Sequence, residues 1–234
     1  MNAIILAAGR GERMRPLSDR IPKPLLTVGG ASLIEWQVRR LTAAGIRDIV
    51  VNVSHLAEMI VAELGDGERL GARIRYSHEP VALETAGGVA LALPLLGDDA
   101  FVAVNADIYC EYDYSALPPV LDRLEREHTD WAAYLVLIDN PAHHPRGDFT
   151  LSRDGLVGVA AQGRLTFSGI GAYRPSFFAG IAPGSRKPLG PMLYDAGAQG
   201  RVHGERFAGR WVDVGTPQRL AQLRATLGAT GEAS

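Results

Sequence analysis

A loop rich in glycine and positive charge follows the first apolar run of the chain. Gly9 and Gly11 stand directly after that run, and glycine lets backbone N–H groups approach a phosphate closely. The positively charged residues of this loop are Arg10, Arg13, Arg15 and Lys23. Because the net charge of the whole chain is only −2, this local group of cations predicts a site for an anion such as a nucleoside triphosphate.

Two well-known phosphate-binding motifs do not fit this loop. A P-loop requires Gly-Lys-Ser/Thr at a spacing where this chain has Arg13 to Arg15. The dinucleotide-binding fingerprint requires a small third residue, and Met14 occupies that position. A simpler alternative stays open, in which the glycines only form a turn and the arginines only face solvent.

Lys23 stands between Pro22 and Pro24. Each proline fixes its own φ angle and favours extended geometry in the residue before it, so we expect Lys23 on a stiff, extended piece of backbone. A cation held in this way loses little entropy when it binds phosphate. Beside Arg13, Lys23 is therefore a candidate phosphate-binding residue, although taken alone it also fits a loop lysine between turn prolines.

Asn105 and Asp107 end the apolar run at 100–107, and Asp213 lies in an apolar stretch near the end of the chain. Ligands collect beyond the carboxyl ends of the strands in an open parallel sheet. Mg²⁺ takes one or two protein carboxylates together with phosphate oxygens. We therefore expect Asp107 and Asp213 to hold Mg²⁺ opposite the triphosphate. The alternatives are that Asp107 forms a turn and that Asp213 caps the helix expected after Thr216.

Two further segments carry weaker signals. A run of small residues precedes an expected helix, and a flat turn of this kind can lie against a planar base. Its residues are Thr85, Ala86, Gly87 and Gly88. The polar segment 139–149 contains the neighbouring histidines His143 and His144, which cannot easily share one ion, so we expect a loop over a sugar-sized substrate rather than a zinc site.

The composition excludes several kinds of partner. Hydrophobic residues make up 47% of the 234 residues and charged residues 21%, as in ordinary globular proteins. With a net charge of −2, no general basic field favours nucleic acid or an anionic membrane. Cys110 is the single cysteine, so no intrachain disulfide can form. Met1 is followed at once by an apolar strand, and we expect a cytoplasmic protein whose oligomeric state the sequence leaves open.

The first half of the chain alternates between strand and helix patterns. Ser32 and Glu35 form a capping-box pattern that predicts the start of a helix, and Gly45 predicts its end. A second helix is expected over 55–64, and the expected strands are 2–8, 47–53, 72–77 and 100–107. This alternation indicates right-handed crossovers and a mostly parallel sheet.

The second half is less regular. A strand is expected within 130–139, short strands within 147–160 and 164–173, and a final helix from Thr216 to Gly228. The small, polar tail 229–234 is expected to fray. Because no repeat or linker divides the chain, we expect one domain over residues 1–228.

These motifs, taken in order, resemble the signature of the sugar-1-phosphate nucleotidyltransferase family. That signature is similar to Leu-Ala-Ala-Gly-x-Gly-Thr-Arg, then Pro-Lys-Pro, then Asn-Gly-Asp, then Trp-x-Asp-[Ile/Val]-Gly-Thr. The matching segments are 6–13, 22–24, 105–107 and 211–216. The resemblance implies an α/β fold, a Rossmann-like three-layer sandwich with a mostly parallel mixed central sheet. Its front half would bind the nucleotide and its back half the sugar phosphate.

Within that family, the segments ETAGG, DNPAHHPRGDF, FSGIGAYRP and WVDVGT look most like bacterial N-acetylmuramate-1-phosphate uridylyltransferases of cell-wall recycling. The likeness implies uridylyl transfer from UTP to a sugar 1-phosphate, with Mg²⁺ as cofactor. The residues it implies as catalytic are Arg13, Lys23 and Asp107, and those it implies as metal ligands are Asp107 and Asp213. Those implied to bind the nucleotide or, for Asn105 and Asn140, the sugar phosphate are Leu6, Ala7, Ala8, Gly9, Gly11, Glu12, Arg13, Lys23, Thr85, Ala86, Gly87, Asn105 and Asn140.

Three features depart from the family pattern. Glu12 replaces a common threonine, Ala106 replaces a common glycine, and the Glu-Lys-Pro sugar motif of many relatives is missing. The missing motif leaves the sugar least defined. A mannose-1-phosphate guanylyltransferase and a thymidylyl- or cytidylyltransferase stay open as alternatives. So does a non-catalytic nucleotide-sugar sensor, although such a chain usually loses the cations or an aspartate that this one retains.

Overall fold

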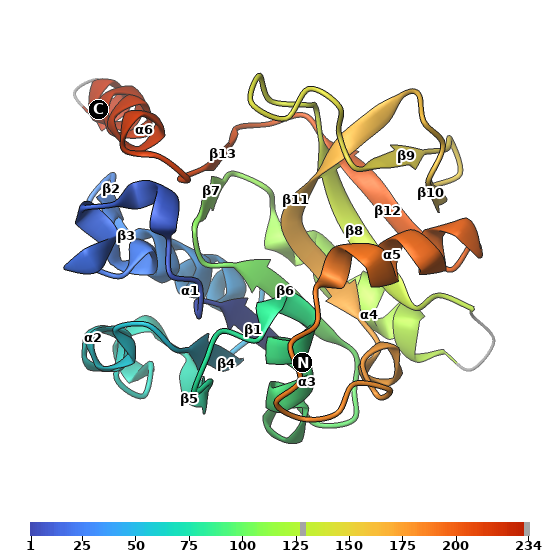
Figure 1. Cartoon of the computed structure of the whole chain (residues 1–234), viewed down its shortest axis with the longest axis horizontal. Helices are drawn as coiled ribbons and strands as arrows, with labels where there is room; N and C mark the ends of the chain where they lie inside the picture. The colour runs from blue at the N-terminus through green and yellow to red at the C-terminus, as the bar shows by residue number, and fades with distance from the viewer. Residues whose placement is uncertain (127–129, 232–234) are drawn as a thin grey trace.

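A nine-stranded mixed sheet runs through the centre of the computed structural model, which describes residues 1–126 and 130–231 (Figure 1). Its main path has the order β10-β9-β11-β6-β1-β4-β5, and β8 pairs with β11 and β12. The strands are β1 (Asn2–Leu6), β4 (Asp48–Val53), β5 (Arg73–His78), β6 (Phe101–Asn105), β8 (Ala133–Ile138), β9 (Phe149–Leu151), β10 (Val157–Gly158), β11 (Arg164–Tyr173) and β12 (Val202–Phe207).

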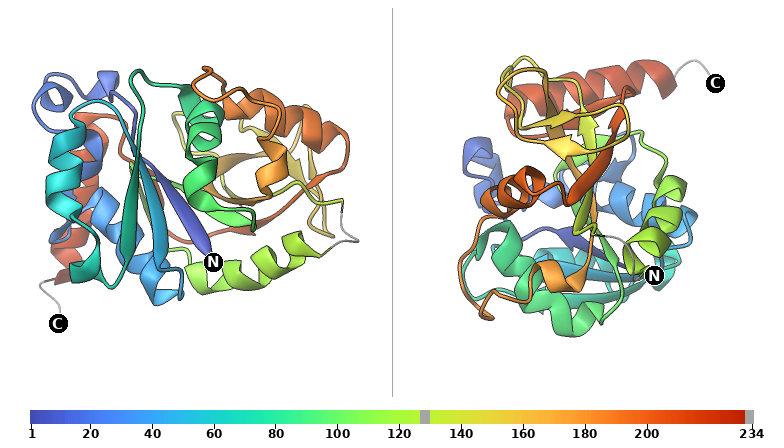
Figure 2. Two further views of the ribbon diagram at one scale, coloured as in Figure 1. Left: turned by 90° about the horizontal axis from the view of Figure 1, so that it is seen from below. Right: turned by 90° about the vertical axis from the view of Figure 1, so that its right-hand side faces the viewer.

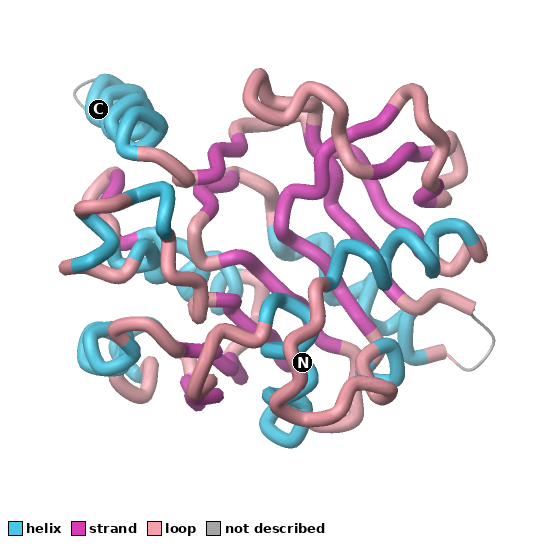
Figure 3. Tube along the Cα trace, in the orientation of Figure 1, coloured by secondary structure: helices cyan, strands magenta, loops and turns pink. Residues whose placement is uncertain are grey.

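Two small two-stranded sheets lie beside the central one (Figure 3). One pairs β2 (Thr27–Val28) with β3 (Ala31–Ser32), and the other pairs β7 (Ile108–Cys110) with β13 (Trp211–Asp213). The second pair joins segments that are far apart in the sequence.

Six α-helices and six short 3-10 helices complete the described residues. The α-helices are α1 (Leu33–Ala43), α2 (Ala57–Leu64), α3 (Glu84–Leu96), α4 (Leu117–Glu125), α5 (Leu189–Ala198) and α6 (Pro217–Gly231). The 3-10 helices are η1 (Glu12–Met14), η2 (Leu17–Asp19), η3 (Lys23–Leu25), η4 (Glu68–Leu70), η5 (Tyr114–Ala116) and η6 (Pro175–Phe177). No helix among them is both long and apolar enough to cross a membrane.

Helices cover both faces of the sheet, as the two views in Figure 2 show. Successive residues of β1 point to opposite faces, because side chains alternate along a strand. Ile5 is buried in a cluster with Val38 of α1 and Ile60 of α2. Ile4 is buried in the other cluster with Val89 of α3. The predicted three-layer sandwich with a mostly parallel front half is confirmed.

The parallel strands β1, β4, β5 and β6 follow the predicted apolar runs. β1 pairs with β4 on one side and β6 on the other, and both pairings are parallel. In the second half, 164–173 is one ten-residue strand, antiparallel to β6 and β8, with a register shift between Phe167 and Gly171. The helices α4 and α5 lie in segments for which the sequence predicted no helix.

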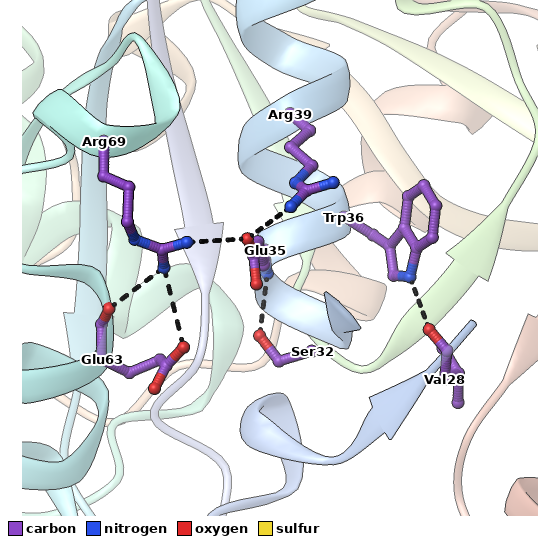
Figure 4. Close-up of polar contacts among 7 residues, drawn as sticks. All are labelled: Val28, Ser32, Glu35, Trp36, Arg39, Glu63 and Arg69. Atoms are coloured by element: carbon purple, nitrogen blue, oxygen red, sulfur yellow. Dashed lines mark hydrogen bonds and ion pairs between the residues drawn. The ribbon is translucent and has the colours of Figure 1, made fainter. Parts of the chain in front are cut away.

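The start of α1 has one half of the predicted capping box. The Ser32 hydroxyl accepts a hydrogen bond from the Glu35 N–H at 3.3 Å. The Glu35 carboxylate does not reach back, because it accepts hydrogen bonds from Arg39 at 2.8 Å and Arg69 at 3.1 Å (Figure 4). On the neighbouring turn the Trp36 indole donates to the Val28 carbonyl at 2.9 Å.

The last helix, α6, begins as predicted. The Thr216 hydroxyl accepts a hydrogen bond from the Arg219 N–H at 3.3 Å, as an N-cap residue does. The helix continues to Gly231 and so includes the first three residues of the segment expected to fray. Residues 232–234 of that predicted tail lie outside the described residues.

Candidate active site

Two joined clefts lie beyond the carboxyl ends of β1 and β6, where open parallel sheets bind ligands. The smaller cleft has a volume of about 310 Å³, and its lining includes Gly9, Asn105 and Asp107. The larger has a volume of about 660 Å³ and is lined mainly by apolar residues such as Tyr173 and Leu189. Both clefts share four lining residues: Leu6, Glu84, Thr85 and Asn105. A ligand could therefore occupy each cleft, and the two ligands would meet at this shared wall.

The glycine loop forms one edge of the smaller cleft. β1 ends at Leu6, so Ala7 and Ala8, which were predicted as the end of the strand, belong to the loop with Gly9. Both alanines are buried, and Ala8 and Gly9 line the cleft. Gly11 has a φ angle of +63°, a left-handed conformation that glycine adopts without strain, and η1 begins directly after it.

The two predicted cations have different surroundings. Lys23 is 8% exposed, and its Nζ contacts the Asp107 carboxylate. Arg13 and Glu12 are exposed on η1, and Arg13 has no ion-pair partner in the described parts of the chain. The prediction that Lys23 lies on extended backbone was wrong. Lys23 starts η3 instead, because Pro24 lies early in that helix, where its missing N–H is not needed.

The pairing of β13 with β7 brings Asp213 next to the chain segment of Asp107. Asp213 stands opposite Ile108, and the Val214 N–H donates to the Asp107 carbonyl at 2.9 Å. Asp213 does not cap α6, because Thr216 does. The two aspartate segments therefore lie side by side, although only Asp107 lines the smaller cleft, and a metal ion shared by the two carboxylates stays a prediction.

The Asp213 carboxylate is partly neutralised within the protein. Its Oδ2 lies 2.9 Å from Arg219 Nη2, and its Oδ1 lies 3.0 Å from His143 Nε2. The Oδ1 atom is buried, yet no donor in the described residues has hydrogen-bond geometry toward it. A carboxylate oxygen without a hydrogen bond, next to the Asp107 segment, fits a hard divalent cation such as Mg²⁺, which prefers oxygen ligands. The described residues contain no group of three or more His, Cys, Asp or Glu side chains that could form a metal cage, so phosphate oxygens or water would complete the coordination.

The small residues of 85–88 were predicted to form a turn before a helix. They are instead part of α3, which begins at Glu84. The backbone N–H groups of Ala86 and Gly87 donate to the Lys187 carbonyl at 3.0 and 3.1 Å. These two N–H groups are thus already occupied, whereas Thr85 lines both clefts. A Cβ atom on Gly87 would lie 2.3 Å from the Ser185 carbonyl oxygen, so the small residue permits a close approach of two backbones.

The structure does not bring Asn140 into the group. Its side-chain amide donates to the Pro145 carbonyl at 3.2 Å and the Arg164 carbonyl at 2.9 Å, and its Oδ1 accepts from Thr166 at 2.8 Å. Its amide therefore holds the loop after β8 against β11. Asn105, by contrast, lies at the shared wall, where it faces Gly169 across a gap too small for a Cβ atom.

Several residues of the smaller cleft were missed in the sequence, and two of them, Asn52 and Glu79, are buried polar residues. Asn52 is the second-last residue of β4, within the run IVVNV, and Glu79 follows β5. Burial raises the pKa of Glu79, and hydrogen bonds from the Leu83 N–H and from Asn52 offset part of that rise. A polar residue inside a continuous apolar strand was the signal that could have identified Asn52.

Comparison with known proteins decides the family. Residues 2–145, more than half of the chain, match the nucleotidyl transferase family. The chain belongs to that family.

Individual nucleotidyl transferases resemble the chain over almost its whole length. An N-acetylmuramate alpha-1-phosphate uridylyltransferase of Neisseria meningitidis is 49% identical, with 98% of this chain and 99% of the relative covered. A protein of the same name from Caulobacter vibrioides is 36% identical, with 96% of each chain covered. A mannose-1-phosphate guanyltransferase of Aspergillus fumigatus is 32% identical over 93% of this chain but only 62% of the relative.

Two solved structures share the fold of this chain. A glucose-1-phosphate thymidylyltransferase from Bacillus anthracis, in complex with sucrose, has a TM-score of 0.84 at 21% identity and covers 97% of this chain and 95% of its own. HddC from Yersinia pseudotuberculosis, in complex with GMP-PN, has a TM-score of 0.77 at 19% identity and covers 96% and 98%. At this identity the likeness establishes the α/β fold of the central sheet.

Proposed function

We propose that the protein transfers the uridylyl group of UTP to N-acetylmuramate 1-phosphate and releases pyrophosphate. The carrying observation is the pair of clefts that meet at Asn105, beside the contact of Lys23 with Asp107. The smaller cleft, with its glycine-loop edge, suits the nucleotide, and the larger apolar cleft suits the sugar. The base and sugar are chosen from the 49% identity to the Neisseria relative of that name.

The reaction breaks one bond and forms another at the α-phosphorus of UTP. An ionised oxygen of the sugar 1-phosphate attacks this phosphorus, and the bond to the bridging oxygen of the β-phosphate breaks. Pyrophosphate leaves with the electron pair. Because the attacking oxygen is already ionised, the reaction requires no general base, and positioning and charge neutralisation are the tasks of the protein.

The side chains of the site match these tasks. Lys23 is buried and held by Asp107, so its ammonium group is pre-positioned beside the phosphates. Arg13 is exposed on η1 and can turn toward the leaving pyrophosphate. Gly9 leaves the loop backbone open to the triphosphate, since no atom outside its immediate neighbours lies within 4 Å of where its Cβ would be.

Mg²⁺ is the cofactor in this proposal. Asp107 and Asp213 would hold it, and when bound it supplies Lewis-acid polarisation of phosphate oxygens. On binding, the Asp213 carboxylate would exchange its contacts with His143 and Arg219, which now lie at 3.0 and 2.9 Å, for the ion. Asn140 stays a proposed sugar-phosphate contact only if its loop moves.

The substrates suggest the setting of the reaction. N-acetylmuramate is a sugar of the bacterial cell wall, and UTP is a cytoplasmic metabolite. We therefore place the proposed activity in the cytoplasm, in the recovery of cell-wall sugars.

A substrate panel tests this function. The purified protein would be assayed for pyrophosphate release with UTP, GTP, dTTP and CTP, each paired with the 1-phosphates of N-acetylmuramate, N-acetylglucosamine and mannose. We expect the highest kcat/KM for UTP with N-acetylmuramate 1-phosphate. Preference for GTP with mannose 1-phosphate would instead assign a guanylyltransferase, and nucleotide binding without pyrophosphate release from any pair would assign a sensor.

A further inference from the structure

We propose that Asn52 and Glu79 are positioning residues that fix the separation between the two backbone walls of the nucleotide cleft. The identity of the ligand, UTP, rests on the function proposed above. One wall is the start of the glycine loop at 7–9, and the other is the N-terminal end of α3 at 83–86. Asn52 and Glu79 lie between these walls and line the cleft.

An unbroken chain of hydrogen bonds connects the walls. The Ala7 N–H donates to Asn52 Oδ1 at 2.7 Å. Asn52 Nδ2 donates to Glu79 Oε1 at 2.6 Å, and Glu79 Oε2 accepts from the Leu83 N–H at 2.9 Å. Each link therefore has one donor and one acceptor. Because a backbone N–H group stands at both ends, the two side chains must be one amide and one carboxylate.

The pair is buried, so its hydrogen bonds do not compete freely with water. Asn52 is 3% exposed and Glu79 is 4% exposed. A buried polar group that loses its partner pays its full desolvation penalty, which makes such a chain of bonds specific for one geometry. A change of either side chain therefore shifts the walls or leaves a donor unpaired.

Close contact with α3 makes the pair a spacer as well as a tether. A Cβ atom on Gly88 would lie 2.4 Å from Glu79 Oε1 and 2.7 Å from Asn52 Nδ2. Only glycine lets the helix lie this close to the two side chains. This contact explains the second glycine of the ETAGG segment, just as the close approach of the Ser185 carbonyl explains the first.

The polarity of the chain of bonds suggests an exchange experiment. In E79Q, two N–H donors face each other wherever the new amide turns, and in N52D two carboxylates face each other. In the double variant N52D/E79Q every bond returns. The new carboxylate at position 52 accepts from the Ala7 N–H and from the new amide at position 79, whose carbonyl oxygen accepts from the Leu83 N–H. The double variant also keeps the net charge and almost the same atoms.

Steady-state kinetics of N52D, E79Q and N52D/E79Q with UTP and the sugar 1-phosphate test the proposal. We expect each single change to raise the KM for UTP by roughly 10- to 100-fold, the effect of one unpaired buried group. The KM for the sugar 1-phosphate should change less than the KM for UTP, because Asn52 and Glu79 line only the smaller cleft and most of the larger cleft is formed by other residues. The double variant should return the KM for UTP to within about threefold of the wild type.

A matched control separates positioning from general stability. Glu35 is also a buried, hydrogen-bonded glutamate, 6% exposed, but it lies on α1 and lines neither cleft. We expect E35Q to lower the thermal midpoint and leave the KM for UTP unchanged. Wild-type UTP KM in both single variants, or a double variant no better than they are, would overturn the proposal. If the single variants fold too poorly for assay, the double variant is compared with the wild type alone. Recovery of folding with a wild-type KM for UTP supports the proposal, and a folded double variant with a raised KM for UTP contradicts it.

Failure of the proposed function would be recognised separately. In that case the wild type releases no pyrophosphate from any substrate pair. UTP binding measured by calorimetry on the same proteins then replaces KM. Weaker UTP binding in N52D and E79Q than in the wild type and the double variant supports the positioning role of the pair. Equal UTP affinities in all four proteins contradict it.

Discussion

Lys23 is a buried cation of this site. It is 8% exposed, and its ammonium group contacts the carboxylate of Asp107. A buried charge is tolerated when it is paired, and it interacts more strongly with a phosphate than an exposed one does. Arg13, exposed on η1, depends on ligand binding for its position.

Removal of either cation should therefore slow the reaction in distinguishable ways. We expect K23A and R13A to lower kcat/KM by roughly 10² to 10³, the usual effect of losing one contact to developing charge. K23A should also weaken folding, because it leaves the Asp107 carboxylate unpaired. Pyrophosphate-release kinetics and thermal unfolding measure both effects. Arg20 is an exposed arginine at the end of η2, so R20A serves as the control and should retain wild-type kinetics. Near-wild-type turnover in K23A would show that Lys23 has no role in the mechanism.

At the scale of elements, polar bridges hold helices that carry no catalytic residue. The Glu35 carboxylate on α1 binds Arg39 of the same helix and Arg69 of η4, and Arg69 also lies 3.7 Å from Glu63 of α2 (Figure 4). This cluster connects α1 with η4 and α2. The same helix contacts β2 through the hydrogen bond of Trp36.

The Glu35 bridge predicts a dependence of stability on pH. Burial alone would raise the pKa of Glu35, but the hydrogen bonds from Arg39 and Arg69 outweigh burial and lower it below its ordinary value of 4.5. A lowered folded-state pKa contributes stability above pH 4.5 that is lost as the pH falls through the folded-state value. We expect E35Q to cost about 1 to 2 kcal/mol at pH 7, since both arginines are partly exposed.

Urea unfolding of wild type and E35Q between pH 7 and pH 3 measures this difference. The gap in free energy of unfolding should narrow as the pH falls below 4.5. A gap that stays constant over this range would contradict the ion-pair account of α1.

At the scale of the whole molecule, the sequence predicted best what depends on local pattern. The strands 2–8, 47–53 and 100–107 were continuous apolar runs, and the structure places β1, β4 and β6 within them. The helix start at Ser32 follows from its local hydrogen bond with Glu35. These features need no knowledge of distant residues.

What depends on tertiary contact could not be predicted in the same way. The start of α3 at Glu84 is supported by the carbonyl of Lys187, which comes from a distant loop. The Asn52–Glu79 bond joins the ends of two strands. Asn140 carried a polar signal, but its partners on β11 decide its role.

The proposed metal site depends on one long-range contact, the pairing of β7 with β13 that places the backbone segments of Asp107 and Asp213 side by side. The most direct test is Mn²⁺ binding, followed by electron paramagnetic resonance with a non-hydrolysable UTP analogue present, in wild type, D107N and D213N. We predict that each variant binds Mn²⁺ at least roughly tenfold more weakly than the wild type. Equal Mn²⁺ affinity in D213N and the wild type would contradict a metal ion shared by the two aspartates.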